Sequence, residues 1–393
     1  MIRKKIKPAF LTAFILLLIV TSNAAGNDTF DIEKNYRDAR FSQVADFLEK
    51  KDYNKLTLKE KLLLIECLTR TAKTSMALEK MDKIFADAGT QPPTAEILTT
   101  AGILYTSLGR LHEAKDFLHR ALTLEKNSPK AMLAEAMLRL YFQEYEKAET
   151  LHGQIAAKHP AWKKTNLFLF AGLEIYKASR NPKKLKETYH LLARKHKKIN
   201  KRHYRNSKAN SRIFKKALKG KMFSVTAAAQ RVVLPMENYR AREAKKIIRL
   251  KINDKTFKVL LDTGNAVGWF IYSRELKEIL KAERGGRSLT RMGLETGTLE
   301  GYHVLCKSVD FGAFKMEFAA GQYVPKPYPE FFDANLNPVF IRERVVSLDY
   351  IEQKLVLSSK ESFDKELAAS TLDSVKLPWY GYERAFIPAV VNK

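Results

Sequence analysis

Between about residues 30 and 195, apolar residues recur at three- and four-residue intervals, with charged residues between them. Leu and Ala fill many of the apolar positions, Glu and Lys fill many of the charged ones, and glycine is infrequent. This spacing puts the apolar side chains on one face of a helix, and these residue types form helices readily. The pattern therefore predicts consecutive amphipathic helices and an all-α part over residues 30–195.

A repeat is visible inside this helical part. From Ala95 to Ser128, small and apolar residues stand where two helices of a repeat would cross: Gly102, Tyr105, Leu108, Gly109, Ala114 and Ala121. The following segment repeats the pattern more loosely, with Ala136, Ala148 and Pro160. This spacing resembles the tetratricopeptide repeat, and residues 62–88 and 166–195 resemble degenerate copies of it. The resemblance implies an α-solenoid whose concave surface binds a peptide or a protein, with a purely structural spacer as the alternative.

After about residue 231 the apolar pattern changes from a helical period to an alternating one. Residues 246–252 and 255–261 read as two strands that flank an Asn-Asp-Lys turn, which is a β-hairpin. Shorter alternating segments follow at residues 308–312, 345–350 and 354–357. The pattern predicts a small all-β lobe over residues 231–358.

The second strand of the hairpin leads directly into Asp262-Thr263-Gly264. A carboxylate at a fixed strand end, a hydroxyl that ties the loop down and a glycine that permits a tight backbone path suit an aspartate that does chemistry. A solvated turn aspartate is the ordinary explanation of three such residues alone. The hairpin before the motif and the strands after it favour the chemical interpretation.

This arrangement resembles the retropepsin-like aspartic peptidases over about residues 231–358. The resemblance implies that Asp262 is catalytic, that Thr263 braces the loop across a lobe interface and that Gly264 allows the turn. Two positions depart from the family. Asn265 stands where the family has Ala or Ser, and residues 335–340 lack the glycine of an apolar-apolar-Gly element, with Asn337 in that region.

In that family two aspartates share one proton, because like charges so close together cannot both ionise, and the pair activates water. The source of a second aspartate stays open. Leu377-Pro378 and Tyr382 repeat the spacing of Leu234-Pro235 and Tyr239, so residues 374–393 read as the possible start of a second similar lobe. Otherwise two chains would each contribute Asp262 as a homodimer.

Such enzymes close a glycine-containing hairpin, the flap, over the substrate, and residues 293–302 are the candidate for it. The flap residues would be Thr296, Gly297, Gly301 and Tyr302. The glycines would allow a mobile hairpin with Tyr302 over a bound peptide, although an ordinary surface hairpin fits equally well. Asp349 also stands on a predicted strand, but no suitable turn follows it, so it reads as a structural or solvated residue.

The formal net charge is +27, and residues 194–221 hold 13 Lys or Arg and no Asp or Glu. We interpret residues 196–230 as a basic linker, or this stretch as a highly solvated final helix. Residues 194–221 would attract an anionic surface of the cell envelope, unless they form a linker with no dedicated partner. Only Tyr204 and Phe214 could stack on bases there, so specific nucleic-acid binding is not expected.

Residues 1–25 have the pattern of a cleaved signal peptide: a basic start, an apolar run over residues 9–20 and small residues at 22–24. The run is short for a membrane span of about 20 residues, so a periplasmic or extracellular location is favoured over an N-terminal anchor. Cys67 and Cys306 are expected as buried free thiols. The cysteines and histidines show no metal-ligand spacing, and neither a metal nor a cofactor is predicted.

Together these patterns predict a two-part chain, with an N-terminal all-α tetratricopeptide-like solenoid and a C-terminal all-β acid-protease-like lobe. The leading hypothesis is an aspartic endopeptidase that acts on a peptide or protein substrate, while the helical repeats recruit the substrate or a protein partner. The alternative is a non-catalytic peptide-binding scaffold with a degenerate protease-like lobe.

Overall fold

The computed structural model describes residues 30–369, apart from short internal segments. Those segments are residues 199, 219–221, 223, 228, 239–245, 253–254, 263–268, 292–297, 311–313, 326–331, 338–340, 342–343 and 350. The chain divides into two compact units, Met1–Ile175 and Tyr176–Lys393. The predicted signal peptide over residues 1–25 and the predicted start of a second lobe over residues 374–393 lie outside the described residues.

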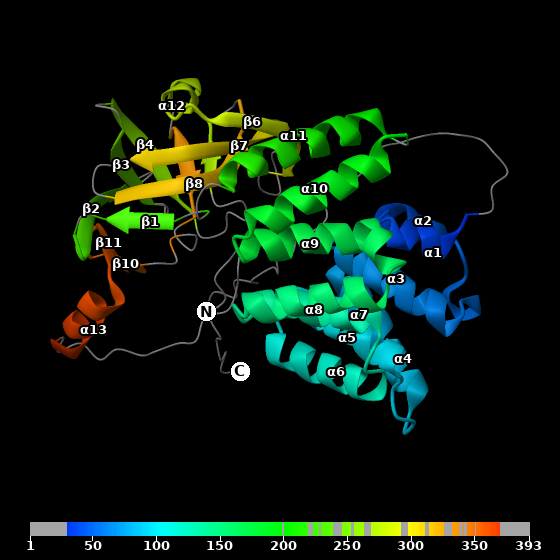
Figure 1. The fold of residues 1–393 in the computed structure, drawn as a ribbon. Helices are drawn as coiled ribbons and strands as arrows, with labels where there is room; N and C mark the ends of the chain where they lie inside the picture. The colour runs from blue at the N-terminus through cyan, green and yellow to red at the C-terminus, as the bar shows by residue number, and fades with distance from the viewer. Residues whose placement is uncertain are drawn as a thin grey trace. The chain divides into compact units, whose positions relative to one another are not determined.

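The first unit is helical, which confirms the helical pattern of the sequence (Figure 1). Its elements are α1 (Ile32–Arg37), α2 (Phe41–Glu49), η1 (Tyr53–Lys55), α3 (Leu58–Arg70), α4 (Thr74–Ala88), α5 (Ala95–Ser107), α6 (Leu111–Leu124), α7 (Pro129–Tyr141), α8 (Tyr145–Lys158), η2 (Trp162–Lys164) and the first part of α9 (Asn166–Ala178). The arrangement of these helices as a tetratricopeptide-like solenoid stays a prediction.

Local chemistry explains where these helices begin and how closely they pack. At the start of α3, the Thr57 hydroxyl accepts from the Glu60 backbone N–H at 3.2 Å, and the Glu60 carboxylate accepts from the Thr57 N–H at 3.0 Å. This capping box satisfies two otherwise unpaired backbone donors. Between α5 and α6, a Cβ atom added to Gly102 would lie 2.5 Å from Leu118 Cγ. Only glycine permits that close approach of the two helices.

The second unit begins with helices, one of which covers a stretch that we interpreted as a basic linker or as a highly solvated final helix. It contains the end of α9, α10 (Pro182–His196) and α11 (Lys201–Ala217), so much of residues 196–230 is helical. Phe214 of α11 is 8% exposed and stacks on Tyr189 of α10, with ring centroids 5.6 Å apart. Ile213 and Ala217 are also buried. These apolar residues fix α11 against its neighbours, which a freely solvated linker would not require.

A mixed sheet of 11 described strands forms the rest of this unit. The strands are β1 (Ser224–Ala227), β2 (Arg231–Asn238), β3 (Lys246–Ile252), β4 (Lys255–Leu261), β5 (Trp269–Ile271), β6 (Glu283–Arg291), β7 (Thr298–Asp310), β8 (Phe314–Tyr323), β9 (Ala334–Leu336), β10 (Val345–Asp349) and β11 (Lys354–Ser358). Their order is β10-β11-β2-β3-β4-β9-β5-β8-β7-β6, and β1 pairs with β8. The predicted hairpin is confirmed as β3 and β4, and the predicted final strand pair as β10 and β11.

The expectation of an all-β lobe over residues 231–358 was too narrow, because the helix α12 (Arg274–Ile279) interrupts its strands. Beyond that range, a further helix, α13 (Lys360–Ala369), follows the last strand. Both begin at a serine whose hydroxyl accepts a backbone N–H three residues on, at 3.2 Å from Leu276 and 3.1 Å from Ser362. Serine caps of this kind, followed by charged residues, favour a helix over a strand. The alternating pattern of the neighbouring strands had led us to predict strands alone.

Helix α11 lies against β6 and β7, at a point where β6 is irregular (Figure 1). The register of β6 against β7 shifts between Arg284 and Arg287, as in a β-bulge. A Cβ added to Gly286 would lie 2.5 Å from the Asn206 carbonyl oxygen of α11. The Gly286 N–H donates to Asn210 Oδ1 at 2.7 Å. The bulge and its glycine therefore let a helix backbone touch a strand directly.

Candidate functional site

Asp262 stands at the point where three strands meet. It follows the last residue of β4, and its N–H donates to the Leu336 carbonyl of β9 at 3.0 Å. Strand β9 runs parallel to β4 on one side and antiparallel to β5 on the other. The chain therefore leaves β4 through Asp262 and returns as β5 beyond an inserted strand. Thr263, Gly264 and Asn265 lie outside the described residues.

The side chain of Asp262 contacts the inserted strand. Asn335 Nδ2 donates to Asp262 Oδ2 at 2.9 Å, and Asn335 is 4% exposed whereas Asp262 is half-buried. Asn335 pairs in register with Leu260, which lies two residues before Asp262. Because alternate residues of a strand share a face, this register brings the amide and the carboxylate to the same side of the sheet.

The hydrogen bond between Asn335 and Asp262 was not predicted, because residues 335–340 stood out in the sequence only for a missing glycine. The sequence did contain a sign of this bond, because Asn335 is a polar residue between the apolar residues Ala334 and Leu336. A buried polar side chain needs a hydrogen-bond partner. Asn337, in the region of the missing glycine, is also fully buried.

Asp333 fixes the start of β9 between its two neighbours. Its carboxylate accepts from the Lys258 N–H of β4 at 2.9 Å, and its carbonyl accepts from the N–H groups of Tyr272 and Ser273 at 2.9 and 3.1 Å. One residue thus ties the short strand to both β4 and the segment after β5. The position of Asn335, two residues further on, follows from this anchoring.

An apolar cluster supports the same strands. Its members come from β3, β4, β5 and the segments around them: Ile247, Leu260, Phe270, Tyr272, Val324 and Phe332. Leu260 and Phe270 are the register partners of Asn335 on either side. The polar pair therefore stands beside a packed core, and the core limits how far the carboxylate can move.

The candidate flap residues fall into two groups. Thr296 and Gly297 lie outside the described residues. Gly301 and Tyr302 belong to β7, between β6 and β8. A Cβ on Gly301 would lie 2.6 Å from the Tyr323 carbonyl oxygen, and the Arg284 guanidinium lies 3.5 Å from the Tyr302 ring centroid. Gly301 thus serves close strand packing in this structure, and the flap role stays a prediction.

Asp349 has a local structural role. Its Oδ1 accepts from the backbone N–H groups of Ile351 and Glu352, at 3.0 and 2.8 Å. These bonds close the turn between β10 and β11. The interpretation of Asp349 as a structural residue agrees with this geometry.

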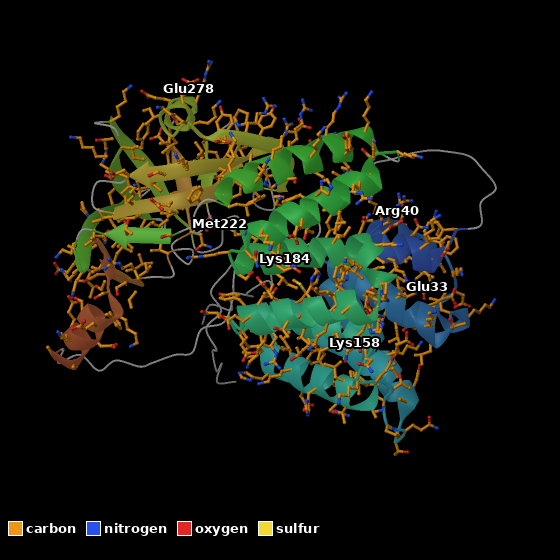
Figure 2. The ribbon with its side chains drawn as sticks, in the orientation of Figure 1. Glu33, Arg40, Lys158, Lys184, Met222 and Glu278 are labelled. Carbon is orange, nitrogen blue, oxygen red and sulfur yellow. The ribbon has the colours of Figure 1, made fainter. Side chains whose placement is uncertain are left out.

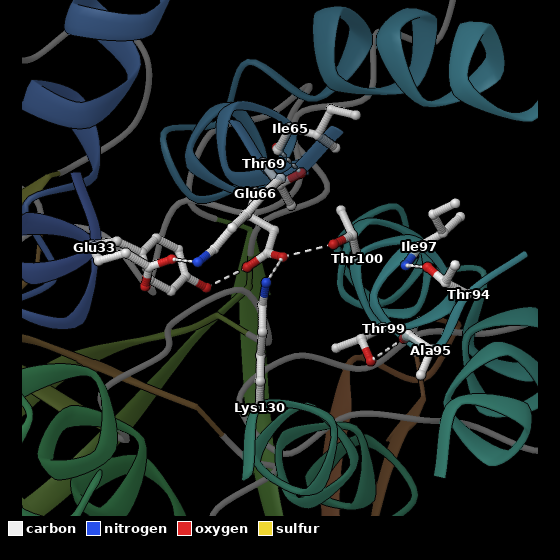
Figure 3. Close-up of polar contacts among 12 residues, drawn as sticks. Glu33, Ile65, Glu66, Thr69, Thr94, Ala95, Ile97, Thr99, Thr100 and Lys130 are labelled. Carbon is white, nitrogen blue, oxygen red and sulfur yellow. Dashed lines mark hydrogen bonds and ion pairs between the residues drawn. The ribbon is translucent and has the colours of Figure 1, made fainter. Parts of the chain in front are cut away.

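A second carboxylate with several polar partners lies in the helical unit (Figure 3). Glu66 of α3 is fully buried, and its carboxylate accepts from the Tyr36 hydroxyl, from the Thr100 hydroxyl at 2.7 Å and from the Lys130 ammonium at 2.5 Å. The four residues come from α1, α3, α5 and α7. Burial opposes ionisation of Glu66, but the Lys130 charge and these hydrogen bonds outweigh it and lower its pKa. The cluster ties four helices together.

The remaining candidate chemistry is limited among the described residues. Cys67 and Cys306 are free and buried, as predicted, and burial raises the pKa of both thiols. No group of three or more His, Cys, Asp or Glu side chains in the described part of the chain is arranged to hold a metal ion. No helix there is long and apolar enough to cross a bilayer.

Comparisons with known proteins add little to this geometry. No family model matches the chain, and no curated protein matches it. Among solved structures, the chain is similar to a retropepsin-like aspartic protease from Rickettsia conorii at 14% identity, over 36% of this chain and 96% of that one, with a TM-score of 0.23. At that score the likeness carries no functional argument.

Proposed function

We propose that this chain is an aspartic endopeptidase in which Asp262 supplies one carboxyl group of the catalytic pair. One observation carries the proposal. The aspartate of an Asp-Thr-Gly sequence ends β4 beside an inserted strand, which bonds to its backbone and to its side chain. A carboxylate held in this way at a strand end is positioned for chemistry instead of free in a loop.

The proposed reaction needs two carboxyl groups. One, ionised, takes a proton from a water molecule as that water attacks the peptide carbonyl, and the other, protonated, donates a hydrogen bond to the carbonyl oxygen. The Asn335 amide donates to Oδ2 of Asp262 and would so restrain the orientation of its carboxylate. The second group would be Asp262 of another copy in a homodimer, or an aspartate of a second lobe. Thr263 and Gly264 would brace and turn the loop.

The helical unit would recruit a peptide or protein to this site. Its close helix crossing at Gly102 and its buried alanines suit stacked helix pairs, which is the support for the tetratricopeptide-like interpretation. The signal-peptide pattern supports a periplasmic or extracellular site of action. The flap candidates would close over the bound substrate.

The test compares peptide cleavage by the natural chain and by Asp262→Asn, over acidic to neutral pH, with and without pepstatin. The variant should lose at least about a thousandfold in kcat, because an amide cannot take the proton from water. Asp349→Asn is the matched control, since that carboxylate only closes a turn, and it should retain cleavage. Pepstatin-resistant cleavage that survives Asp262→Asn would overturn the proposal.

A non-catalytic peptide-binding scaffold is the second candidate. Asn335 and Asn337 favour it, because two buried polar side chains stand where the resemblance leads one to expect an apolar-apolar-Gly element. Such a lobe would bind peptides with equal affinity before and after Asp262→Asn and would cleave none of them. Binding measured by fluorescence anisotropy, beside the cleavage assay, separates the two candidates.

A further inference from the structure

Helix α11 carries its positive charge on one line. Seven of its residues are Lys or Arg, none is acidic, and all seven are exposed. Five of them recur at alternating intervals of four and three residues: Lys201, Arg205, Lys208, Arg212 and Lys215. Residues at this spacing lie on one face of a helix. At 1.5 Å per residue the line, which we call the basic stripe, is roughly 21 Å long.

The basic stripe faces away from the rest of its unit. The buried residues of α11 are Ser207, Asn210, Ile213, Phe214 and Ala217. At 100° per residue they centre about half a turn from the basic stripe. They contact β6 and α10, through the bond of Asn210 to Gly286 and the stack of Phe214 on Tyr189. The packing of the sheet therefore fixes the direction in which the five charges point, and nitrogen-tipped side chains project along α11 (Figure 2).

The two remaining cations of α11 lie beside the basic stripe and are neutralised by the sheet. Arg202 pairs with Glu300 at 3.3 Å, and Lys216 pairs with Glu283 at 2.5 Å. Among the described residues, no carboxylate forms an ion pair with a member of the stripe. Five exposed cations on one face of the helix would complement a partner that supplies anions.

We propose that the basic stripe holds this unit against an anionic phospholipid bilayer. A flat surface can touch all five side chains of a straight, convex helix face at once. Each Lys or Arg near such a surface strengthens binding by about fivefold. The stripe contains no apolar side chain that would insert, so the contact is peripheral and weakens with salt.

Single-stranded nucleic acid fits this surface less well. Proteins bind such strands in grooves whose aromatic side chains stack on the bases. Phe214 is in the core, and Tyr204 is half-buried, with the Lys208 ammonium 5.7 Å from its ring centroid. Phe214 is therefore unavailable for stacking, and Tyr204 offers only a half-buried ring. The proposal does not depend on the peptidase assignment, because it concerns a different face of the unit.

The test uses the full chain without its predicted signal peptide and follows co-sedimentation with two kinds of vesicle. One kind is phosphatidylcholine alone, and the other contains about one third phosphatidylglycerol. The triple variant Arg205→Gln, Lys208→Gln and Arg212→Gln removes the centre of the basic stripe. The matched control, Lys50→Gln, Lys126→Gln and Lys163→Gln, removes the same charge from exposed positions elsewhere.

The natural chain and the control should bind the anionic vesicles in low salt, and neither should bind the neutral ones. The stripe variant should bind about a hundredfold more weakly, from about fivefold per charge, with an unchanged circular dichroism spectrum. Equal binding by both triple variants would overturn the proposal, because net charge alone would then explain it. The proposal would also be overturned if the natural chain bound an oligonucleotide but did not bind the anionic vesicles.

Discussion

The two units each hold a carboxylate that bonds to its surroundings, and they hold it differently. Glu66 in the helical unit is fully buried between a lysine, a tyrosine and a threonine from three other helices. Asp262 in the sheet unit is half-buried at the end of a strand, with an asparagine amide on one oxygen. A carboxylate enclosed by a cation and two hydroxyls stabilises the fold. One at a strand end, with a neutral amide beside it, suits the proposed reaction.

The two carboxylates also differ in how far the cost of removing their charge from water must be offset. An ionised carboxylate without water requires compensating charge, and Lys130 supplies it for Glu66. Asp262 has the neutral amide of Asn335 and partial contact with solvent. Removing the charge should therefore weaken the fold in the first case and the proposed reaction in the second.

The sharpest test of this difference is stability. Glu66→Gln should lower the free energy of unfolding of the helical unit by about 3–5 kcal/mol, because it leaves the Lys130 charge nearly buried and unpaired. Asp262→Asn should change that of the sheet unit by less than about 1 kcal/mol. Glu113→Gln, which removes an exposed pair with Arg110, is the control and should cost less than about 1 kcal/mol. Hydrogen exchange followed by mass spectrometry reports each unit separately, and equal losses in Glu66→Gln and Asp262→Asn would break the comparison.

A second test compares one glycine of each unit, Gly286 with a close neighbour and Gly153 with open space around it. Gly286→Ala should destabilise the contact of α11 with the sheet by about 1–3 kcal/mol, since the new Cβ would lie 2.5 Å from a backbone oxygen. Gly153→Ala in α8 meets nothing within 4 Å, so it should stabilise the helical unit by up to about 1 kcal/mol. Thermal unfolding of both variants measures the effects. A neutral result for Gly286→Ala would mean that α11 can shift away from β6.

The smallest expected effect is a difference in pH dependence. Burial and then the Lys177 charge lower the pKa of His303 in β7 from its usual 6.5 to about 4. The folded sheet unit therefore disfavours the protonated ring, and its stability should fall as the pH drops from about 6.5 towards 4. The residue as a whole is half-buried, so the loss should be smaller than for a residue fully removed from solvent.

The pKa of Glu66 is lowered instead, so the stability that it gives the helical unit is fully present above its usual 4.5 and falls only as the pH drops through the lowered value. The sheet unit should lose protection in hydrogen exchange at a higher pH than the helical unit. His303→Gln should flatten the profile of the sheet unit alone. A profile that His303→Gln leaves unchanged would show that another group titrates in this window.

Local patterns predicted much of this structure, and contacts between distant residues account for the rest. The hairpin of β3 and β4 and the strand end at Asp262 follow from alternation and turn residues within one short segment. The insertion of β9 does not, because three residues carry too little pattern to identify a strand and their partners lie more than 70 positions earlier. The same holds for α11, which was interpreted as part of a linker or as a solvated helix, because the strand that buries one of its faces lies more than 70 positions later.

The short strand β9 has a consequence for folding. The hydrogen bond between Asn335 and Asp262 joins residues 73 positions apart, and the β4–β9 ladder spans a similar distance. Closing such a loop is slow compared with forming a hairpin, since the chain must lose its freedom before the distant contact compensates for it. During synthesis the aspartate would emerge well before the strand that orients it. The nascent lobe would therefore hold an unpositioned carboxylate, and the order of assembly would delay any proteolytic activity until most of the lobe has been made.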